Sequence, residues 1–166
     1  MVDARILAWR NLLSRGVSEG TAGAGAANGA VVTPGDTARW TAGGSCFKIR
    51  QSVTALAAAS GLGVGTLNHP IPPAGLRISA DVWFPPGTDS GYRIQANVDG
   101  SFRTSLPQGV PGQWSRITFT VTGTQLRTFY IIGSDNTAPH PEWEFWVDRV
   151  IVTTATAPAV WWQPGQ

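Results

Sequence analysis

The residue whose chemistry most needs an explanation is Asp148, which lies in the most aromatic and β-branched run of the chain, residues 142–153. Phe145 and Val147 alternate there with polar and aromatic residues, as expected of a central strand. The alternation slips after Asp148, which predicts a bulge or burial on both faces. A carboxylate in such a run needs an arginine partner, backbone N–H donors or a metal ion. Residues 11–20, at the other end of the chain, hold its best candidate partner.

Two acidic residues of the same run are candidates for general acid–base chemistry. Glu142 and Glu144 are two positions apart and would share a strand face, roughly 7 Å from each other. That separation falls between those of retaining and inverting glycosidases, and no second group of carboxylates supports the pair. His69 and His140 each lie beside a proline, without neighbours at metal-ligand or catalytic spacing. We therefore expect that the protein is not an enzyme.

Residues 16–20, Gly-Val-Ser-Glu-Gly, have the spacing of a nucleophile elbow. That motif needs a long strand before the serine and a helix after it. Here residues 11–13 predict only a short strand, and the Gly/Ala-rich residues 21–29 predict a flexible loop. We therefore do not interpret the motif as catalytic.

The composition indicates one packed domain with an unusually uncharged surface. The chain has 166 residues, of which 42% are hydrophobic and 13% charged, where ~25% charged is usual. A net charge of +2 is too small to indicate nucleic-acid binding. No apolar run is long enough for a transmembrane helix, and the first residues do not resemble a secretory signal. Cys46 is the single cysteine, so we expect no internal disulfide and a buried thiol.

Two-residue alternation predicts a series of strands separated by Gly/Pro turns, at residues 45–50, 76–84, 92–98, 102–106, 114–121 and 126–132 as well as in the closing run. In residues 76–84, Trp83 lies opposite the apolar face. In residues 92–98, Arg93, Gln95 and Asn97 lie opposite the apolar face. The spacing of the strands predicts an all-β sandwich or barrel.

Five short motifs occur in order along the chain: Asn11-Leu-Leu13 with Glu19-Gly20, Gly44-Ser45 with Phe47-Lys-Ile49, Pro73-Ala-Gly75 with Ile78-Ser-Ala-Asp-Val82, Gly112-Gln-Trp-Ser-Arg-Ile117, and Phe145-Trp-Val-Asp-Arg-Val150. Together they resemble the β-jelly-roll carbohydrate-binding modules of the broad xylan- and glucan-binding type, and the related domains of bacteriophage tail and virion proteins. The resemblance implies an antiparallel β-sandwich, a jelly roll of 8–10 strands, over residues 11–154. Residues 1–10 would then form an N-terminal arm and residues 155–166 a C-terminal tail.

The resemblance also implies where a metal ion would bind. In such modules a glutamate and the closing-strand aspartate help to hold a structural calcium ion, a hard cation that prefers oxygen ligands. Carried over, the ligands would be Glu19 and Asp148, with backbone carbonyls near Gly44 and Ser45. Arg149 stands where the family pattern has a second aspartate. No other cofactor is expected.

A virion protein is the first functional hypothesis. The chain would be a non-enzymatic tail, fibre or capsid-decoration component of a bacteriophage, made in the host cytoplasm and attached to other virion proteins or to copies of itself. Ile6 and Trp9 could share one face of a short docking helix, and Trp161 and Trp162 could be buried by a partner. The jelly roll could also attach to a host-surface glycan.

The alternative hypothesis is a carbohydrate-binding module of a polysaccharide-degrading system. Sugar rings stack on aromatic faces that are flanked by planar polar side chains. The candidates are Trp83 and, on the same face of the neighbouring strand, Arg93, Gln95 and Asn97. Burial of Trp83 under a loop or subunit is the structural alternative.

Overall fold

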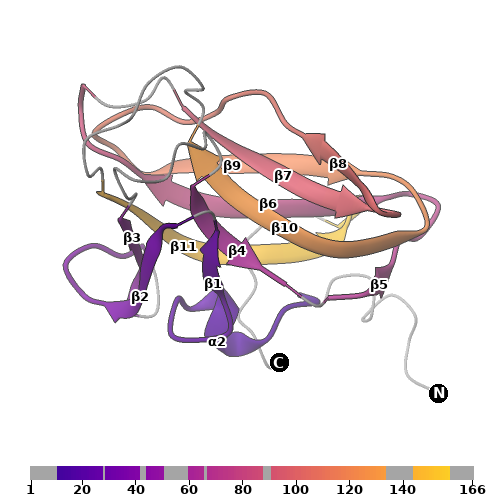
Figure 1. Cartoon of the computed structure of the whole chain (residues 1–166), viewed down its shortest axis with the longest axis horizontal. Helices are drawn as coiled ribbons and strands as arrows, with labels where there is room; N and C mark the ends of the chain where they lie inside the picture. The colour runs from indigo at the N-terminus through magenta and orange to yellow at the C-terminus, as the bar shows by residue number, and fades with distance from the viewer. Residues whose placement is uncertain are drawn as a thin grey trace.

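The computed structural model describes residues 11–27, 29–41, 44–50, 60–65, 67–87, 91–133 and 144–157. They form two facing antiparallel β-sheets, and the helix that they contain is the single turn α2 (Arg15–Ser18). Figure 1 shows the long strands of the two sheets crossing the length of the molecule, with α2 below β1. The predicted antiparallel β-sandwich is confirmed.

We call the two sheets A and B. Sheet A has the order β1 (Gly25–Ala27), β4 (Gly61–Val64), β10 (Gln125–Gly133), β7 (Tyr92–Val98) and β8 (Ser101–Thr104), and β5 (His69–Pro70) pairs with one end of β10. Sheet B has the order β2 (Val31–Asp36), β3 (Cys46–Arg50), β11 (Glu144–Thr154), β6 (Leu76–Trp83) and β9 (Ser115–Val121). Sequence neighbours β6 and β7 therefore lie in different sheets.

The core fills the space between the sheets with the apolar face of each long strand. The predicted alternation of apolar and polar residues in β6 and β7 is confirmed. Its apolar members, which include Ile78, Val82, Ile94 and Val98, are fully buried in one cluster. The ring of Tyr92 bridges the sheets, with centroids 4.7 Å from Phe84 and 4.5 Å from Phe145. The remaining residues of these strands therefore face outward, away from the opposite sheet.

The slip predicted in the closing strand is a β-bulge. Asp148 of β11 pairs with Asp81 of β6, and the ladder resumes only at Ile151 opposite Ser79. Arg149, at the bulge, has a left-handed φ of 45°. The extra residue lets Val150 and Val152 return to the core, where both are fully buried.

Asn11 fastens the start of the chain to this bulge, and the strand predicted for residues 11–13 is wrong. The side-chain oxygen of Asn11 accepts from the backbone N–H of Val152 at 3.0 Å and of Leu13 at 3.1 Å, which bends the segment into a turn. Its side-chain amide and the Ser18 hydroxyl both donate to the carbonyl of Val150. The prediction that the first and last segments meet is thus confirmed, although the contacts are amide and hydroxyl bonds.

Two further differences concern residues 16–29. The Gly-Val-Ser-Glu-Gly motif begins inside the one-turn helix α2, so it is not a nucleophile elbow. The predicted loop that follows contains the short edge strand β1.

The hairpin predicted at Asp99 and Gly100 joins β7 to β8. Both residues have positive φ, 54° and 88°, as a type I′ turn requires. The Asp99 carboxylate accepts hydrogen bonds from Thr124 and Gln125 at the start of β10, and these bonds, led by the Thr124 hydroxyl, lower the pKa of Asp99. The hairpin is thereby tied to the central strand of sheet A.

Several predictions fall outside the described residues: the docking side chains Ile6, Trp9, Trp161 and Trp162, and the candidate acid–base residues Glu142 and His140. Among the residues that the structure does describe, no helix is long and apolar enough to cross a membrane.

Candidate functional site

The predicted glycan-binding group is divided between the two sheets. Trp83 is on β6 of sheet B, whereas Arg93, Gln95 and Asn97 are on β7 of sheet A. The prediction that these strands are neighbours is wrong, because the loop between them crosses from one sheet to the other. Their outward faces point in opposite directions, so Trp83 and the β7 row do not contact one ligand surface.

Trp83 is covered on its own sheet. The guanidinium carbon of Arg39 lies 3.4 Å from the centre of the Trp83 ring, and Trp146 packs its ring edge-on at 5.2 Å. Trp146 in turn donates from its indole nitrogen to Asp36 at 3.2 Å. A cation in contact with the ring face occupies the position that a stacked sugar would need. This arrangement matches the structural alternative considered for Trp83.

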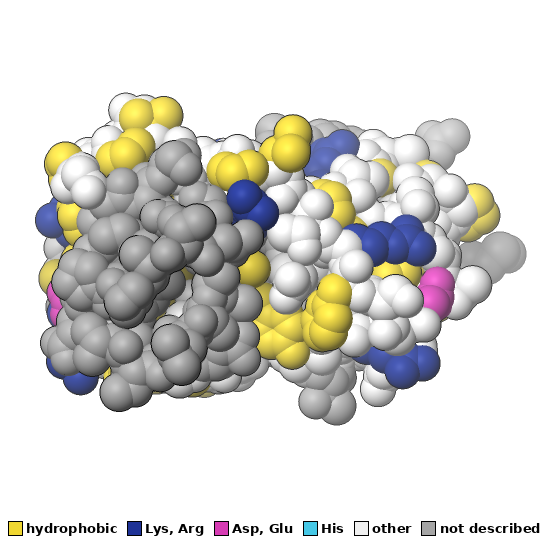
Figure 2. Space-filling model, turned by 45° about the horizontal axis from the view of Figure 1, so that its top comes forward, with side chains coloured by type: hydrophobic (Ala, Val, Ile, Leu, Met, Phe, Trp, Pro, Cys, Tyr) yellow, Lys and Arg dark blue, Asp and Glu magenta, His cyan; other side chains and the backbone are white. Residues whose placement is uncertain are grey.

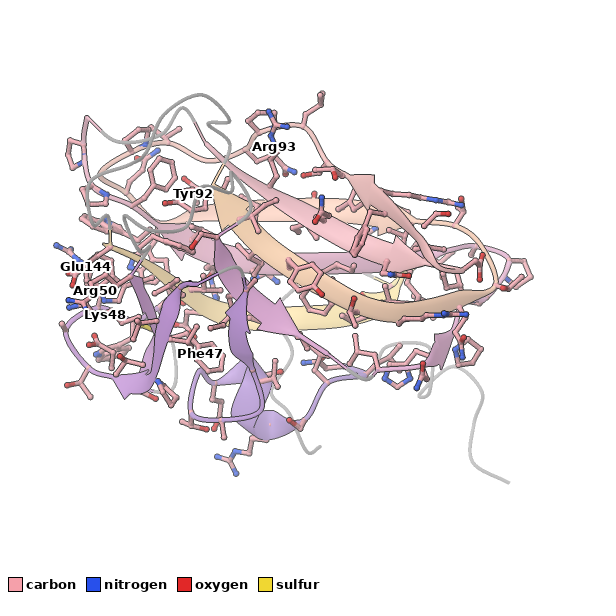
Figure 3. The ribbon with its side chains drawn as sticks, in the orientation of Figure 1. Phe47, Lys48, Arg50, Tyr92, Arg93 and Glu144 are labelled. Carbon is pink, nitrogen blue, oxygen red and sulfur yellow. The ribbon has the colours of Figure 1, made fainter. Side chains whose placement is uncertain are left out.

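Two charged side chains on the outer face of sheet B neutralise each other. Lys48 of β3 forms an ion pair of 2.9 Å with Glu144 of β11, the described member of the candidate acid–base pair. Figure 3 shows Lys48, Arg50 and Glu144 gathered at one end of sheet B. Glu144 is therefore engaged with a strand neighbour.

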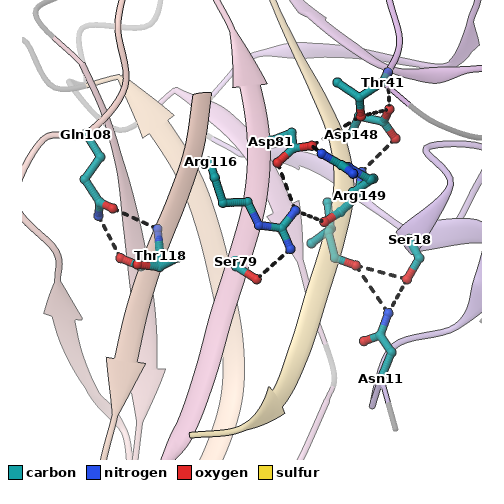
Figure 4. Close-up of polar contacts among 11 residues, drawn as sticks. Asn11, Ser18, Thr41, Ser79, Asp81, Gln108, Arg116, Thr118, Asp148 and Arg149 are labelled. Carbon is teal, nitrogen blue, oxygen red and sulfur yellow. Dashed lines mark hydrogen bonds and ion pairs between the residues drawn. The ribbon is translucent and has the colours of Figure 1, made fainter. Parts of the chain in front are cut away.

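The buried carboxylate Asp148 is satisfied by hydrogen bonds, and its neighbour Asp81 by arginines (Figure 4). The backbone N–H and hydroxyl of Thr41 each donate to one oxygen of Asp148 at 2.6 Å, and the backbone N–H of Arg149 donates to the other at 2.7 Å. Asp81 accepts from Arg116 at 2.9 Å and from the Arg149 side chain. The bulge at Arg149 thus supplies an N–H to one carboxylate and a guanidinium to the other.

The calcium ligands implied by the resemblance are not arranged as a ligand set. Glu19 holds the guanidinium of Arg15 with both carboxylate oxygens, at 2.9 and 3.0 Å. Asp148 accepts from N–H and O–H donors that a cation would have to displace. In the described part of the chain no three His, Cys, Asp or Glu residues are grouped so that they could hold a metal ion. Calcium binding by Glu19 and Asp148 stays a prediction.

The outer face of sheet A has a different character, and it carries the other three predicted residues. Arg93, Gln95 and Asn97 form a half-buried outward row on β7. Tyr130 of β10 is directly opposite Gln95, and Phe102 of β8 is directly opposite Asn97. Directly opposite residues of an antiparallel pair point to the same side. Two aromatic rings therefore flank the polar row.

The two rings lie close together across β7. The ring centroids of Phe102 and Tyr130 are 6.1 Å apart, and Phe102 is 56% exposed. Beside Tyr130, β4 and β1 present Gly63 and Gly25, which are themselves register partners. A Cβ on Gly63 would lie 3.2 Å from ring carbons of Tyr130, so the missing side chain lets this ring lie down on the sheet. We call the rings of Phe102 and Tyr130 the aromatic platform. Gly63 and Gly25, which have no side chains, lie next to Tyr130.

The two amides of the row are fixed at one end and free at the other. Gln95 donates from its amide nitrogen to the Thr104 hydroxyl at 3.3 Å, and the Asn97 oxygen accepts from the Gly100 N–H at 3.1 Å. Within the described residues, the Gln95 oxygen and the Asn97 nitrogen make no hydrogen bond to the protein. Such side chains are held in position to bind hydroxyl groups of a ligand.

Sequence reasoning did not include Tyr130 and Phe102 in the site. The signal for Tyr130 is present in the sequence, because it alternates with the core residues Phe129 and Ile131 and must face outward. Phe102 follows the hairpin, and its side is defined only once the register with β7 is known.

Comparisons with solved structures agree with this fold. The chain is similar to the CBM22-1 xylan-binding domain of Paenibacillus barcinonensis Xyn10C, with 18% identity, a TM-score of 0.65, and coverage of 90% of this chain and 97% of that one. It is also similar to the C-terminal family 22 carbohydrate-binding module of Clostridium thermocellum Xyn10B, with 19% identity, a TM-score of 0.60, and coverage of 83% and 89%. No protein-family model and no curated protein sequence matches the chain. At these identities the likeness shows the jelly-roll fold alone.

Proposed function

We propose that this chain is a non-catalytic carbohydrate-binding module that holds a polysaccharide on the outer face of sheet A. The observation that carries the proposal is the pair of outward rings, Tyr130 and Phe102, beside amides that are fixed at one end and free at the other. An aromatic ring provides the apolar face on which a pyranose stacks, and the amides bind its hydroxyl groups.

The fold supports this proposal but does not carry it, because one fold serves many functions. The similar structures include xylan-binding domains, which makes β-linked plant polysaccharides the first ligands to test. The low charge of the chain also suits a neutral or weakly charged polymer better than a nucleic acid.

The proposal is tested with affinity electrophoresis of the purified chain through gels containing soluble xylan, mixed-linkage glucan, xyloglucan, agarose or polyuronates. We expect retardation by at least one polymer. Tyr130→Ala should bind it about tenfold more weakly, which is the ~1.4 kcal/mol expected from the loss of one stacked ring. Phe102→Ala should act in the same direction, with an unfolding midpoint close to that of the parent protein.

Trp83→Ala is the matched control on the opposite sheet. It removes an aromatic side chain that Arg39 covers, so we expect lower stability and unchanged affinity per folded molecule. If no polysaccharide retards the parent chain, or if Trp83→Ala loses affinity and Tyr130→Ala does not, the proposed site is wrong.

The virion role predicted from the chain ends stays a prediction, as does attachment to other virion proteins or to further copies. Its docking residues lie outside the described part of the chain, and the similar structures named above are carbohydrate-binding domains. A glycan-binding face is compatible with a host-surface role. We therefore place the polysaccharide-binding function first.

A structural calcium ion is a separate proposal with its own test. Thermal unfolding is measured after dialysis against a chelator and again after calcium is added back. A higher midpoint with calcium, abolished by Glu19→Gln, would support binding at Glu19 and Asp148. Equal midpoints would rule it out.

A further inference from the structure

We propose that Arg93 makes the outer face of sheet A selective for polysaccharides that carry carboxylate groups, that is, for glycans containing uronic acids. This inference rests on the proposed carbohydrate-binding function, to which it adds the charge class of the ligand and the residue that selects it.

Arg93 has a hydrogen-bond donor that the protein leaves unused. Its side chain extends outward from β7, opposite Ile132 of β10, and is half-buried. The Nε atom is itself buried, yet it has no hydrogen-bond partner. Figure 3 shows Arg93 near the top of the view, apart from Lys48, Arg50 and Glu144 at the left. A buried N–H without an acceptor is unfavourable, so a ligand that accepts from Nε, once the guanidinium turns outward to meet it, gains affinity.

The position of Nε in the guanidinium group determines which kind of ligand group can accept from it. The N–H groups of Nε and of the adjacent terminal nitrogen point in the same direction, with a spacing that matches the two oxygens of a carboxylate. A single sugar hydroxyl satisfies one of these donors. A uronate carboxylate satisfies both and also neutralises the guanidinium charge.

The charges around Arg93 differ from those around the three arginines that form ion pairs. Arg116 and Arg149 bind Asp81, and Arg15 binds Glu19. On the outward sides of β4, β7, β8 and β10, by contrast, no side chain among the described residues is acidic. In the part of Figure 2 where side chains are coloured, basic and apolar ones lie across this side of the molecule and acidic ones only towards the two ends. Arg93 therefore presents a positive charge that no neighbouring strand neutralises.

Arg93 also lies within reach of a sugar stacked on the platform. It precedes Gln95 by two positions on the same face, roughly 7 Å along the strand. Gln95 is the register partner of Tyr130. The carboxylate of a uronic acid projects from the edge of the sugar ring, so the ring can stack on Tyr130 while the carboxylate reaches Arg93.

The experiment compares polymers that differ only in the carboxylate. Glucuronoxylan, alginate and polygalacturonate are each tested beside the same polymer after its carboxyl groups have been reduced to primary alcohols. We expect at least one acidic form to bind at least roughly tenfold more tightly than its reduced form, as for one charge-assisted bidentate contact. Arg93→Gln should remove that preference, so that the variant binds the acidic and the reduced form of the polymer with equal affinity. Because Arg93 has an unsatisfied donor, Arg93→Gln should not lower the unfolding midpoint.

Arg127→Gln is the charge-matched control, since it removes an exposed arginine from β10 of the same sheet. It should keep the preference for the acidic polymer. If Arg127→Gln loses the preference as fully as Arg93→Gln does, the effect is general electrostatics and the proposal is overturned.

The remaining outcomes separate this inference from the function on which it rests. If neutral xylan or glucan binds and Tyr130→Ala weakens it, but the acidic and reduced polymers bind alike, then the carbohydrate function stands and the Arg93 inference is wrong. If sulfated xylan binds as tightly as glucuronoxylan, Arg93 recognises anions in general, and the assignment to carboxylates is overturned. If no polysaccharide binds, both proposals fail.

Discussion

The outer faces of the two sheets use their polar side chains in opposite ways. On sheet B, Asp81 and Asp148 are buried, and arginine, threonine and backbone donors satisfy them. On sheet A, Gln95 and Asn97 are anchored by one hydrogen bond each and leave their other ends to solvent. Both faces carry aromatic rings, but Arg39 covers Trp83 of sheet B, whereas Phe102 of sheet A is open.

This difference separates a structural surface from a binding surface within one sandwich. Polar groups that satisfy each other lock strands and loops together and offer nothing to a ligand. Polar groups that are held in place but keep unused hydrogen-bonding atoms, next to an accessible ring, are preorganised to bind a ligand. Substitutions on the outer face of sheet B should therefore change stability, and substitutions on the outer face of sheet A should change binding.

The largest expected effect concerns Cys46, which faces outward on β3 beneath the segment that carries Arg39. Its thiol donates to the Arg39 carbonyl, and burial, with the nearby charges of Asp148 and Asp36, raises the pKa of Cys46 to about 12. Since the ordinary value is 9.0, the thiolate fraction at pH 8 falls roughly a thousandfold. We expect alkylation of the native chain to be at least that much slower than in urea.

The same shift predicts a dependence of stability on pH. The folded-state pKa of Cys46 lies above the unfolded value, so its contribution is fully present below pH 9.0 and is lost as the pH rises towards about 12. Cys46→Ser should remove this part of the alkaline loss. Rapid alkylation of the native protein would mean that this side of sheet B is open, which would contradict the comparison.

The next largest effect is expected for Asp81→Ala. The Asp81 side chain is 4% exposed and joins two arginines that are each 30% exposed. Removing it leaves Arg116 and Arg149 without their carboxylate in a poorly hydrated site, which should lower the free energy of unfolding by ~3 kcal/mol or more. Urea denaturation followed by circular dichroism measures the change, and polysaccharide binding per folded molecule should be unaltered.

Asn11→Ala should have a smaller effect on the same side of the sandwich. It removes the acceptor of the Val152 amide and a donor to the Val150 carbonyl at the bulge. We expect a loss of about 2 kcal/mol, typical of a buried polar group left without its partner. Hydrogen exchange supplies the local readout, since the Val152 amide should lose protection before the amides of β7. Uniform loss across both sheets would show that Asn11 acts on the whole fold.

The sequence predicts the sandwich well because alternation and turn chemistry are local. The outward positions of Arg93, Gln95 and Asn97, the hairpin at Asp99 and the slip after Asp148 all follow from neighbouring residues. The prediction of a strand at residues 11–13 failed because a side chain, Asn11, replaces the backbone ladder there.

The candidate site depends on pairings between strands that are distant in sequence. Local sequence patterns do not predict these pairings. Trp83 and the β7 row are close in sequence, yet the connection between β6 and β7 crosses to the other sheet. Tyr130 joins Gln95 only through the register of β10 with β7. The partner of Asp148 is similarly non-local, because Thr41 reaches it from the segment that follows β2.

The smallest effect is expected for Lys48→Gln, which sharpens the comparison within sheet B itself. The Lys48–Glu144 pair has the same 2.9 Å separation as the Arg116–Asp81 contact, but its side chains are 30% and 37% exposed. Water screens an exposed pair, so the loss should be no more than ~0.5 kcal/mol by the same denaturation measurement. A loss comparable to that of Asp81→Ala would mean that burial does not explain why the Asp81 contacts matter, and the division between the two faces would need another cause.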